Sequence, residues 1–591
     1  MKRPVWLSKF LIWRIRHISS RNFVMVLSGL VGVFGGLAAV TLKTTVHWIQ
    51  ESLGNLEGLW TKYAYLFFPL LGIVLTSLVA RKILKARLGH GITGILYAIS
   101  KKSSIISSAK TYSRMITSAI TVGFGGSVGL EAPIVVTGSA IGSSIGQLMH
   151  LNYKQRTLLI GCGAAAAISG IFNSPVAGVI FSIEVILTEV TIAAFIPLLI
   201  ASVFGSLISM LFLGESVLFS FDLKDPFLAS DFPFYLVLGV VCGLASVYFT
   251  RATLFAEYLA HKIRNKMTRA IVGGLALGII IFLFQPIYGE GYETITDILN
   301  GNAGNLLKNS ILLSGLDNTT YLILFGLGVL FIKPIATGLT IGSGGNGGIF
   351  APSLFVGGIT GFLFAQGYNM LNFSKTLSIS NFTLVGMCGV MSGVLHAPLT
   401  AIFLIAEITS GYTLFLPLML VSAVALSTNS RFESHSFYTG KLIKTGDLIH
   451  NDKDRQVLSL IRIDKMIEKD LLQIGPDKTL GDLVALVQRS KRNIFPVVNE
   501  DQELMGIITL DDIREMMFNQ EYQKSVIVQT LMHRPPDTVS PKDKMQEVMS
   551  KFEKTGAWNL PVIQHGKYIG FVSKSRIFNA YRTRLKRQHK E

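Results

Sequence analysis

Charged residues are scarce in this 591-residue sequence, and cysteines are scarcer still. Only 15% of the residues are Asp, Glu, Lys or Arg, whereas soluble globular domains contain about 25%. The three cysteines, Cys162, Cys242 and Cys388, all lie in apolar runs with no paired spacing. The sequence therefore excludes a disulfide framework and a cysteine-rich metal site, and its composition does not fit a soluble protein.

Common catalytic motifs are also missing. The sequence has no zinc-binding H-E-x-x-H motif and no phosphate-binding G-x-x-x-x-G-K loop, so ATP-driven pumping has no visible machinery. One match to the G-x-S-x-G motif of serine hydrolases occurs at Gly125–Gly129, with Ser127 as its serine. That motif needs a strand–turn–helix context and a His–acid pair, and this region has no strand pattern. An intramembrane serine hydrolase is a remote alternative, and we expect no enzymatic activity.

Long apolar segments dominate the sequence instead. Half of the residues are hydrophobic and 57 are glycine, a composition typical of helical membrane proteins. A helix needs about 20 apolar residues to span a bilayer. Segments near this length are Phe23–Leu42, Tyr65–Ala80, Phe232–Thr250, Ala270–Ile287 and Tyr321–Thr340. Others, such as Leu158–Ile171, are predicted to be too short to span. We therefore predict an α-helical polytopic membrane protein with many partial helices.

The placement of charge predicts the orientation. The net charge is +18, and no acidic residue precedes Glu51, while six basic residues precede the first span. The positive-inside rule then places the N-terminus in the cytoplasm. Residues 1–21 are predicted to form an amphipathic basic helix on the inner leaflet, and the basic tail 585–591 a solvated end that does not bind nucleic acid. We expect a multi-pass protein of a bacterial inner (cell) membrane with both termini cytoplasmic.

Two separated pairs of segments repeat within the apolar region. Gly129–Gly142 reads GLEAPIVVTGSAIG and Gly348–Gly361 reads GIFAPSLFVGGITG, so that Glu131 falls opposite Phe350. Ser169–Val185 and Ser392–Ile408 also match, with Glu184 opposite Glu407. The matches predict one duplicated unit with halves at about 22–210 and 232–442. Transporter repeats are commonly inverted, with the binding site where the halves meet.

The repeated Gly-x-x-Ala-Pro segments predict two helix N-termini inside the membrane. Proline in a first helical turn loses only an N–H that would be unpaired, and glycine permits close approach. Free N–H groups and the positive dipole end bind anions without a full charge, so an anion is released easily. A charged side chain in a membrane is a functional hypothesis by default. Glu131 beside such a terminus is predicted to be a tethered anion that blocks the path when ionised and leaves it when protonated.

Several motifs together resemble the CLC family of chloride channels and chloride/proton antiporters. They are GSVGLEAP (Gly126–Pro133), GGIFAP (Gly347–Pro352), GHGIT (Gly89–Thr93), NSPVAGVIFSIE (Asn173–Glu184) and a tyrosine near the end of the apolar region, Tyr438. The resemblance implies a chloride-conducting homodimer in a lipid bilayer, with one pore per subunit. It also implies that Glu131 is the external gate. The implied anion-binding residues are His90, Gly129, Leu130, Gly348, Ile349, Phe350 and Tyr438.

Two departures from this family bear on mechanism. His90 and Thr93 stand where the family commonly has serine and proline; His90 either donates an N–H to the anion or makes a local hydrogen bond. Val185 stands where the antiporters carry an internal proton-relay glutamate, and valine transfers no proton. We therefore expect a channel or weakly coupled transporter, with the chloride/proton antiporter as the alternative. Glu184, whose counterpart Glu407 lies in the half without a gate, is predicted to cap or pair within the fold.

After residue 442 the composition becomes charged, with short strand-like runs. A linker, 443–466, precedes two similar segments, 467–519 and 526–584, which resemble a pair of α/β CBS domains. In such domains a Gly-h-h-Thr-x-x-Asp pattern (h, hydrophobic) can hold the ribose of an adenine nucleotide, and GIITLDD supplies Thr509 and Asp512. The second copy has Ser573 but Arg576 in place of the acid. A nucleotide site and a purely structural dimerisation module both remain open, and no cofactor is predicted for transport itself.

Overall fold

The computed structural model of the chain describes residues 11, 13–14, 16–54, 61–85, 91–187, 192–214, 227–308, 318–409, 411–444, 458 and 461–590. His90, most of the predicted N-terminal helix and part of the predicted linker lie outside these residues. The chain forms two compact units, Met1–Leu448 and Ile449–Glu591, which we describe separately.

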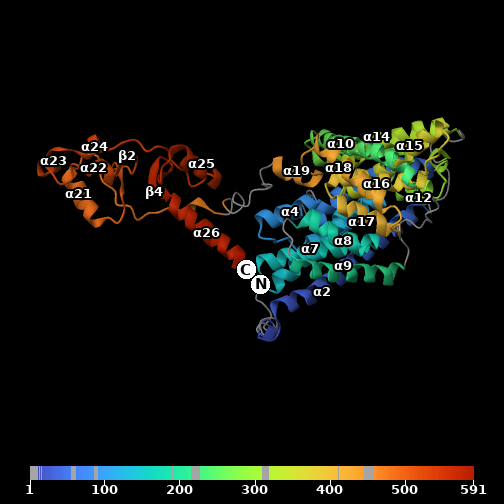
Figure 1. Ribbon diagram of the computed structural model, residues 1–591, viewed down its shortest axis with the longest axis horizontal. Helices are drawn as coiled ribbons and strands as arrows, with labels where there is room; N and C mark the ends of the chain where they lie inside the picture. Colours follow the sequence, from blue (N-terminus) through green and yellow to red (C-terminus); the bar gives the residue numbers. More distant parts are fainter. Residues whose placement is uncertain are drawn as a thin grey trace. The chain divides into compact units, whose positions relative to one another are not determined.

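Helices joined by loops and turns make up the first unit in its described residues, and its N-terminal half is coloured blue to green in Figure 1. The helices of this half are α2 (Ser20–Gly54), α3 (Thr61–Leu78), α4 (Gly91–Lys101), α5 (Lys110–Gly123), α6 (Glu131–Leu148), α7 (Tyr153–Phe172), α8 (Pro175–Phe181) with a π-helical turn at Ser182–Ile186, and α9 (Ile192–Leu213).

The C-terminal half, green to orange in Figure 1, follows a short 3₁₀ turn at Ala229–Asp231. Its helices are α10 (Phe232–His261), α11 (Lys266–Leu283), α12 (Tyr292–Leu299), α13 (Asn305–Lys308), α14 (Thr319–Ser343), α15 (Phe350–Met370), α16 (Ile379–Leu395), α17 (Pro398–Ile408), α18 (Phe415–Ser430) and α19 (Phe437–Lys444). A 3₁₀ turn at Gln285–Ile287 joins α11 to the loop before α12.

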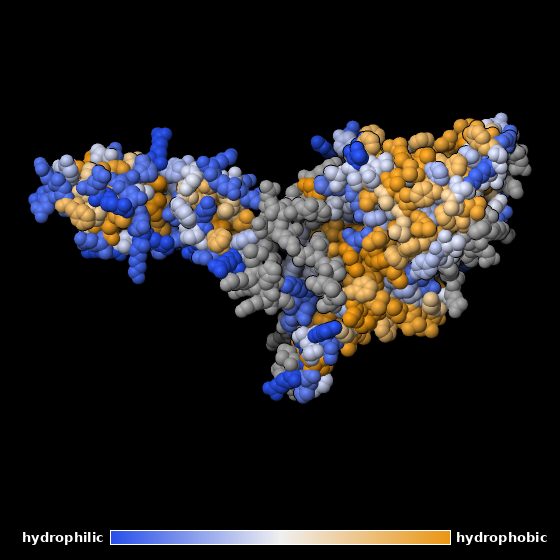
Figure 2. Space-filling view, in the orientation of Figure 1, coloured by the Kyte–Doolittle hydropathy of each residue, from blue (hydrophilic) through white to orange (hydrophobic). Residues whose placement is uncertain are grey.

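Eight of the described helices are long and apolar enough to cross a membrane. One of them corrects the prediction that Leu158–Ile171 is too short, because α7 has 20 residues. The side chain of Asn152 caps this helix by accepting the N–H of Gln155 at 2.9 Å, so the helix starts at Tyr153 and includes a polar first turn. Apolar side chains also cover a broad area of the surface of this unit (Figure 2), as expected for a protein in lipid.

The predicted duplication is visible in how the helices pack. In the first half α6 packs on α7, and in the second half α15 packs on α16. Each pair touches through two glycines at matching positions of the repeat: Gly138 faces the Gly163 carbonyl, and Gly357 faces the Gly386 carbonyl. A side chain at any of these positions would collide with backbone, so the glycines allow the close helix approach typical of membrane proteins.

The second unit contains two β-hairpins of matching construction. Strands β1 (Ile494–Val498) and β2 (Leu504–Thr509) pair antiparallel, as do β3 (Asn559–Gln564) and β4 (Lys567–Ser573). Each hairpin has one register shift near its turn, between Val497 and Val498 or between Val562 and Ile563. Helices accompany each hairpin: α21 (Leu480–Arg489), α22 (Leu510–Ile513), α23 (Gln520–Ser525) and α24 (Val528–Leu531) for the first, and α25 (Met545–Thr555) and α26 (Lys574–Lys590) for the second.

Candidate functional site

The two predicted helix N-termini meet at the centre of the first unit. α6 begins at Glu131 and α15 begins at Phe350, each with its proline in the first turn. The residues two positions earlier join them: the N–H of Gly129 donates to the Gly348 carbonyl at 2.9 Å, and the N–H of Gly348 donates to the Gly129 carbonyl at 2.8 Å. This reciprocal pair holds two positive dipole ends side by side, in the place where the two halves of the repeat come together.

The carboxylate of Glu131 lies in the narrow space between these termini. The residue is only 1% exposed. Its Oε1 accepts a hydrogen bond from the Tyr292 hydroxyl at 2.7 Å, while its Oε2 has no hydrogen-bond partner among the described residues. A Cβ built on Gly129 would collide with Oε2 and would also lie 2.9 Å from the Ala351 Cβ, so the carboxylate folds back toward the start of α15. One oxygen of a buried anion therefore faces a helix N-terminus.

The predicted backbone donors differ in what they bind. The N–H groups of Gly129 and Gly348 are used in the reciprocal pair, and the N–H of Leu130 donates to the Glu290 carboxylate at 3.0 Å. No described residue accepts a hydrogen bond from the N–H of Ile349 or Phe350. The Phe350 ring is buried against Phe172 and Phe181. The geometry thus leaves the α15 terminus with donors available to an anion.

A cavity of about 140 Å³ opens beside the α15 terminus and contains Tyr438. The Tyr438 side chain comes from α19 and is 5% exposed, and no residue in the described part of the chain hydrogen-bonds to its hydroxyl. Thr93, at the start of α4, fixes the backbone there by donating to the Tyr438 carbonyl at 3.2 Å. The cavity has a mostly basic polar lining; the charged or titratable residues in it are Arg114, Glu257, His261, Arg269 and Lys441. Its lining also includes Gly348 and Ile349, so an anion in it meets both α15 backbone and the tyrosine.

Three residues near Glu131 were missed in the sequence analysis. They are Tyr292, Glu290 and Lys333, and all lie in the second half of the chain. Lys333 is fully buried on α14 and donates from its Nζ to the carbonyls of Ile287 and Gly289 at 3.1 and 3.0 Å. The rule that singled out Glu131, a charge inside an apolar segment, applies equally to Lys333 and would have found it. Glu290 and Tyr292 follow the apolar segment in a polar stretch and carry no comparable signal.

The structure confirms the architectural reading of Glu184 and Glu407. Glu184 accepts the N–H groups of Leu399 and Thr400 at 3.1 and 2.7 Å, at the N-terminus of α17. Glu407 accepts the N–H groups of Val176 and Ala177 at 3.0 and 2.8 Å, at the N-terminus of α8. Each glutamate therefore caps the helix of the other repeat. Val185, directly after Glu184, packs against the apolar core.

In the second unit, Thr509 and Asp512 cap a helix together. The N–H and hydroxyl of Thr509 both donate to Asp512 Oδ2 at 2.7 Å, and His533 Nε2 lies 3.1 Å from the same oxygen. Partial burial alone would raise the pKa of Asp512, but the hydrogen bonds from Thr509 outweigh it and lower the pKa below its usual value of 3.8. One oxygen of the Asp512 carboxylate, Oδ2, is therefore already engaged within the chain.

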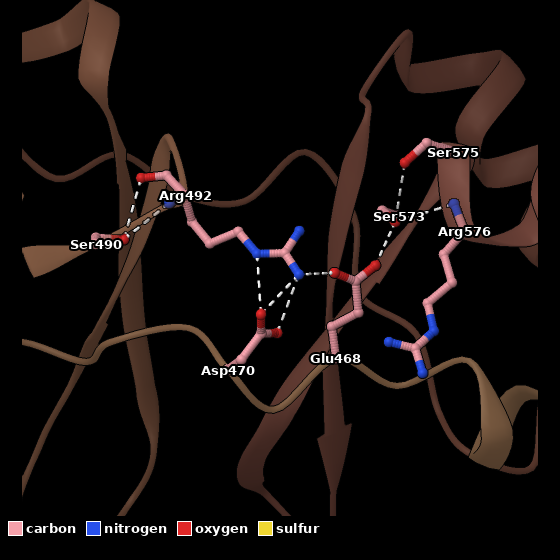
Figure 3. A network of polar contacts seen from close by, with 7 residues as sticks. All are labelled: Glu468, Asp470, Ser490, Arg492, Ser573, Ser575 and Arg576. Carbon is pink, nitrogen blue, oxygen red and sulfur yellow. Dashed lines mark hydrogen bonds and ion pairs between the residues drawn. The ribbon is translucent and has the colours of Figure 1, made fainter.

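The matching position of the second hairpin is also occupied by the chain itself (Figure 3). Ser573 donates its hydroxyl to Glu468, whose other oxygen pairs with Arg492 at 2.5 Å. Arg492 also binds Asp470 at 2.8 Å, and this hydrogen bond lowers the pKa of Asp470. Arg576 stands nearby in place of the acid, with its backbone N–H on the Ser573 hydroxyl. The network links the two hairpins of the unit.

The family described as voltage gated chloride channel matches residues 72–430, more than half of the chain. The protein belongs to the CLC family. CBS domains match residues 463–519 and 528–583. The CLC assignment covers the helices that carry Glu131, the α15 terminus and the capping glutamates, and it identifies the first unit as a multi-pass anion-transport domain.

Named relatives of this CLC protein include both channels and exchangers. It is 26% identical to the chloride channel protein CLC-f of Arabidopsis thaliana over 92% of this chain and 78% of that one. It is 28% identical to the H⁺/Cl⁻ exchange transporter ClcA of Vibrio campbellii over 73% of this chain and 91% of that one. Among solved structures, a slow cyanobacterial Cl⁻/H⁺ antiporter matches with a TM-score of 0.62 at 22% identity over 72% of this chain and 98% of that one. A eukaryotic CLC transporter matches with a TM-score of 0.61 at 18% identity over 94% of this chain and 99% of that one.

The CLC assignment leaves the serine hydrolase without support. Ser127 is fully buried and donates its hydroxyl to the Ile287 carbonyl at 2.8 Å. None of the described histidines hydrogen-bonds to it, so the residue has no general base. The glycine-rich match reflects tight helix and loop packing in a CLC fold.

Proposed function

We propose that the protein conducts small anions, chloride foremost, through a CLC pore in which Glu131 is the gate, and that the flow is not strictly coupled to protons. The observation that carries the proposal is the position of the Glu131 carboxylate, enclosed between the paired N-termini of α6 and α15 with one oxygen unpartnered. A helix N-terminus offers partial positive charge and N–H donors, which attract an anion but release it.

In this proposal the carboxylate and a free anion compete for the same terminus. When Glu131 is ionised, its own negative charge occupies the space beside α15 and repels the anion. Protonation removes that charge and leaves the N–H groups of Ile349 and Phe350, with the Tyr438 hydroxyl, to the anion. The cavity that contains Tyr438 is lined largely by basic residues, which favour the entry of anions by electrostatic focusing.

Val185 is the basis for uncoupled flow. A coupled exchanger needs a titratable relay between Glu131 and the other face of the membrane, and valine provides none. Glu184 is not a replacement, because its two oxygens hold Leu399 and Thr400. The competing proposal is chloride/proton exchange, which the names of the Vibrio relative and the cyanobacterial structure favour.

Reconstitution into liposomes distinguishes the two. A chloride gradient is imposed at equal pH on both sides, and proton movement is followed with a pH-sensitive dye. We expect chloride flux without sustained uphill proton transport. Uphill proton transport that stops in Glu131→Gln would establish an exchanger and contradict the Val185 argument.

We further propose that the protein works as a homodimer in the cell membrane with both termini in the cytoplasm. The basic N-terminus supports this orientation. For the CBS pair we propose a structural role, because Asp512 and Ser573 are both engaged within the chain. Cross-linking in native vesicles and protease access to the CBS unit in inside-out vesicles test these points.

A further inference from the structure

A second, larger cavity is lined by two residues that contact the start of α6. Its volume is about 510 Å³. It lies among the C-terminal end of α2, the helix α3 and the loop before α12. Glu290 and Tyr292 line it, whereas Glu131 does not. Glu290 and Tyr292 therefore border this cavity and also contact the start of α6, at Leu130 and Glu131.

The loop carrying Glu290 touches α6 at its first turn. Glu290 Oε1 accepts the N–H of Leu130, the residue directly before the gate, at 3.0 Å. Two residues along the loop, the Tyr292 hydroxyl donates to Glu131 Oε1 at 2.7 Å. One short segment thus holds both a backbone donor of the α6 terminus and the gating carboxylate.

A buried lysine, Lys333, holds the loop before α12 in place by hydrogen bonds. Lys333 Nζ donates to three backbone carbonyls of the loop, those of Ile287, Gly289 and Glu290, at 3.1, 3.0 and 3.3 Å. The loop therefore has a defined conformation, and Glu290 is held against Leu130 by the fold. Lys333 is also close enough to Glu131 and Glu290 to interact with both electrostatically.

Other titratable groups face Glu290 from each neighbouring element. Two of these groups are the basic residues Lys43 on α2 and Lys333 on α14. The other two are Glu131 on α6 and Tyr292 on α12. The rest of the cavity wall contributes His47, Tyr65, Tyr288, Glu293 and Asp297. Replacing either carboxylate by its amide therefore removes one titratable group from this cluster.

Resting on the proposed function, we propose that Glu290 is a second gating carboxylate, which closes the outer side of the anion path by holding the Leu130 N–H and responds to protons in the larger cavity. When ionised it takes a donor that an anion needs and adds negative charge at the entrance. When protonated it accepts the N–H weakly and repels no anion. The gate then consists of two carboxylates, of which only Glu290 borders that cavity.

The test is anion efflux from liposomes as a function of external pH at fixed internal pH, for Glu290→Gln, Glu131→Gln, the double variant and Glu51→Gln. Glu51 is an exposed glutamate on α2 and serves as the matched control for the same chemical change. We expect Glu290→Gln to raise flux at external pH 8 at least about three-fold. We expect Glu131→Gln to keep a residual pH dependence that the double variant loses, and Glu51→Gln to follow the parent protein.

The outcomes separate the two proposals. If Glu290→Gln follows the parent while Glu131→Gln loses all pH dependence, the gate has one carboxylate and the inference about Glu290 is wrong. If no variant conducts anions, the proposed function itself fails. Should Glu290→Gln not yield folded protein, Glu290→Asp keeps the charge but shortens the reach to Leu130. Raised flux at pH 8 supports the inference, and flux equal to the parent overturns it.

Discussion

The two halves of the membrane unit differ most where they carry carboxylates. Glu184 and Glu407 occupy matching positions and make the same contacts in mirror fashion, each capping a short helix of the other half. Glu131 and Phe350 also occupy matching positions, but one is a buried carboxylate and the other a buried aromatic ring. The matching glutamates, Glu184 and Glu407, join the two halves by hydrogen bonds. The pair that differs, Glu131 and Phe350, lies at the candidate site.

This contrast separates two uses of a helix N-terminus. At α8 and α17 backbone N–H groups of the first turn, which have no acceptor within their own helix, donate hydrogen bonds to a glutamate of the other half. At α15 the N–H groups of Ile349 and Phe350 have no partner among the described residues. The same chemistry therefore serves stability where a cap is present, and under the proposed function it serves anion binding where no described residue caps the helix.

The largest expected effect comes from breaking a matching pair. Glu407→Ala removes two hydrogen bonds to a charged group and leaves the Val176 and Ala177 N–H groups unpaired, which costs about 3 kcal/mol or more. We expect a clear fall in the unfolding temperature of the purified protein. Glu433→Ala is the control, because among the described residues that glutamate forms an ion pair with the exposed Arg251, a contact worth about 0–1 kcal/mol. Equal losses in both variants would contradict the capping role.

The glycines that join the termini offer a sharper comparison. A Cβ at Gly348 would lie 2.7 Å from the Ala132 Cβ, and one at Gly129 would lie 2.9 Å from the Ala351 Cβ. Either alanine variant pushes the termini apart, and we expect anion flux to fall about ten-fold, equivalent to about 1.4 kcal/mol. Only Gly129→Ala also displaces Glu131, so only that variant should alter the external pH dependence. Identical pH profiles in the two variants would show that Glu131 does not rest over Gly129.

A smaller effect is expected at Tyr438, the tyrosine proposed to bind the anion. Tyr438→Phe removes a hydroxyl that no described residue hydrogen-bonds, so stability should not fall. The variant should bind chloride about five-fold more weakly, which corresponds to about 1 kcal/mol for one hydrogen bond. Isothermal titration with chloride measures this. Tyr235→Phe is the matched control. The Tyr235 hydroxyl is also buried without a hydrogen-bond partner among the described residues, but Tyr235 does not line the cavity that contains Tyr438.

The smallest effect concerns the CBS unit. Asp512→Ala removes half of a capping box, worth about 1 kcal/mol, so the segment from residue 461 onward should melt a few degrees lower at pH 7. The lowered pKa of Asp512 means that its contribution is complete above the usual value of 3.8 and disappears as the pH falls through the lowered pKa. The two melting curves should therefore converge in acid. Millimolar adenine nucleotide should leave the melting temperature unchanged, and a rise that requires Asp512 would instead establish a nucleotide site.

The repeated motifs predicted the helix starts at Glu131 and Phe350 because glycine and proline determine backbone conformation locally. They also predicted the structural role of Glu184, because a glutamate at the matching position of both halves is expected to make the same kind of contact in each. The contacts of Glu290 and Tyr292 with α6 were not predictable in the same way. They join residues about 160 positions apart, through a loop whose conformation depends on the buried Lys333.

The central claim is that Glu131 competes with a free anion for the α15 terminus. The most direct test compares anion flux in the parent protein and Glu131→Gln at external pH 5 and pH 8, because the neutral amide imitates the protonated acid. The account predicts that the parent conducts much less at pH 8 than at pH 5, and that Glu131→Gln conducts at both and loses most of this difference. Flux in Glu131→Gln that stays as pH-dependent as in the parent would contradict it.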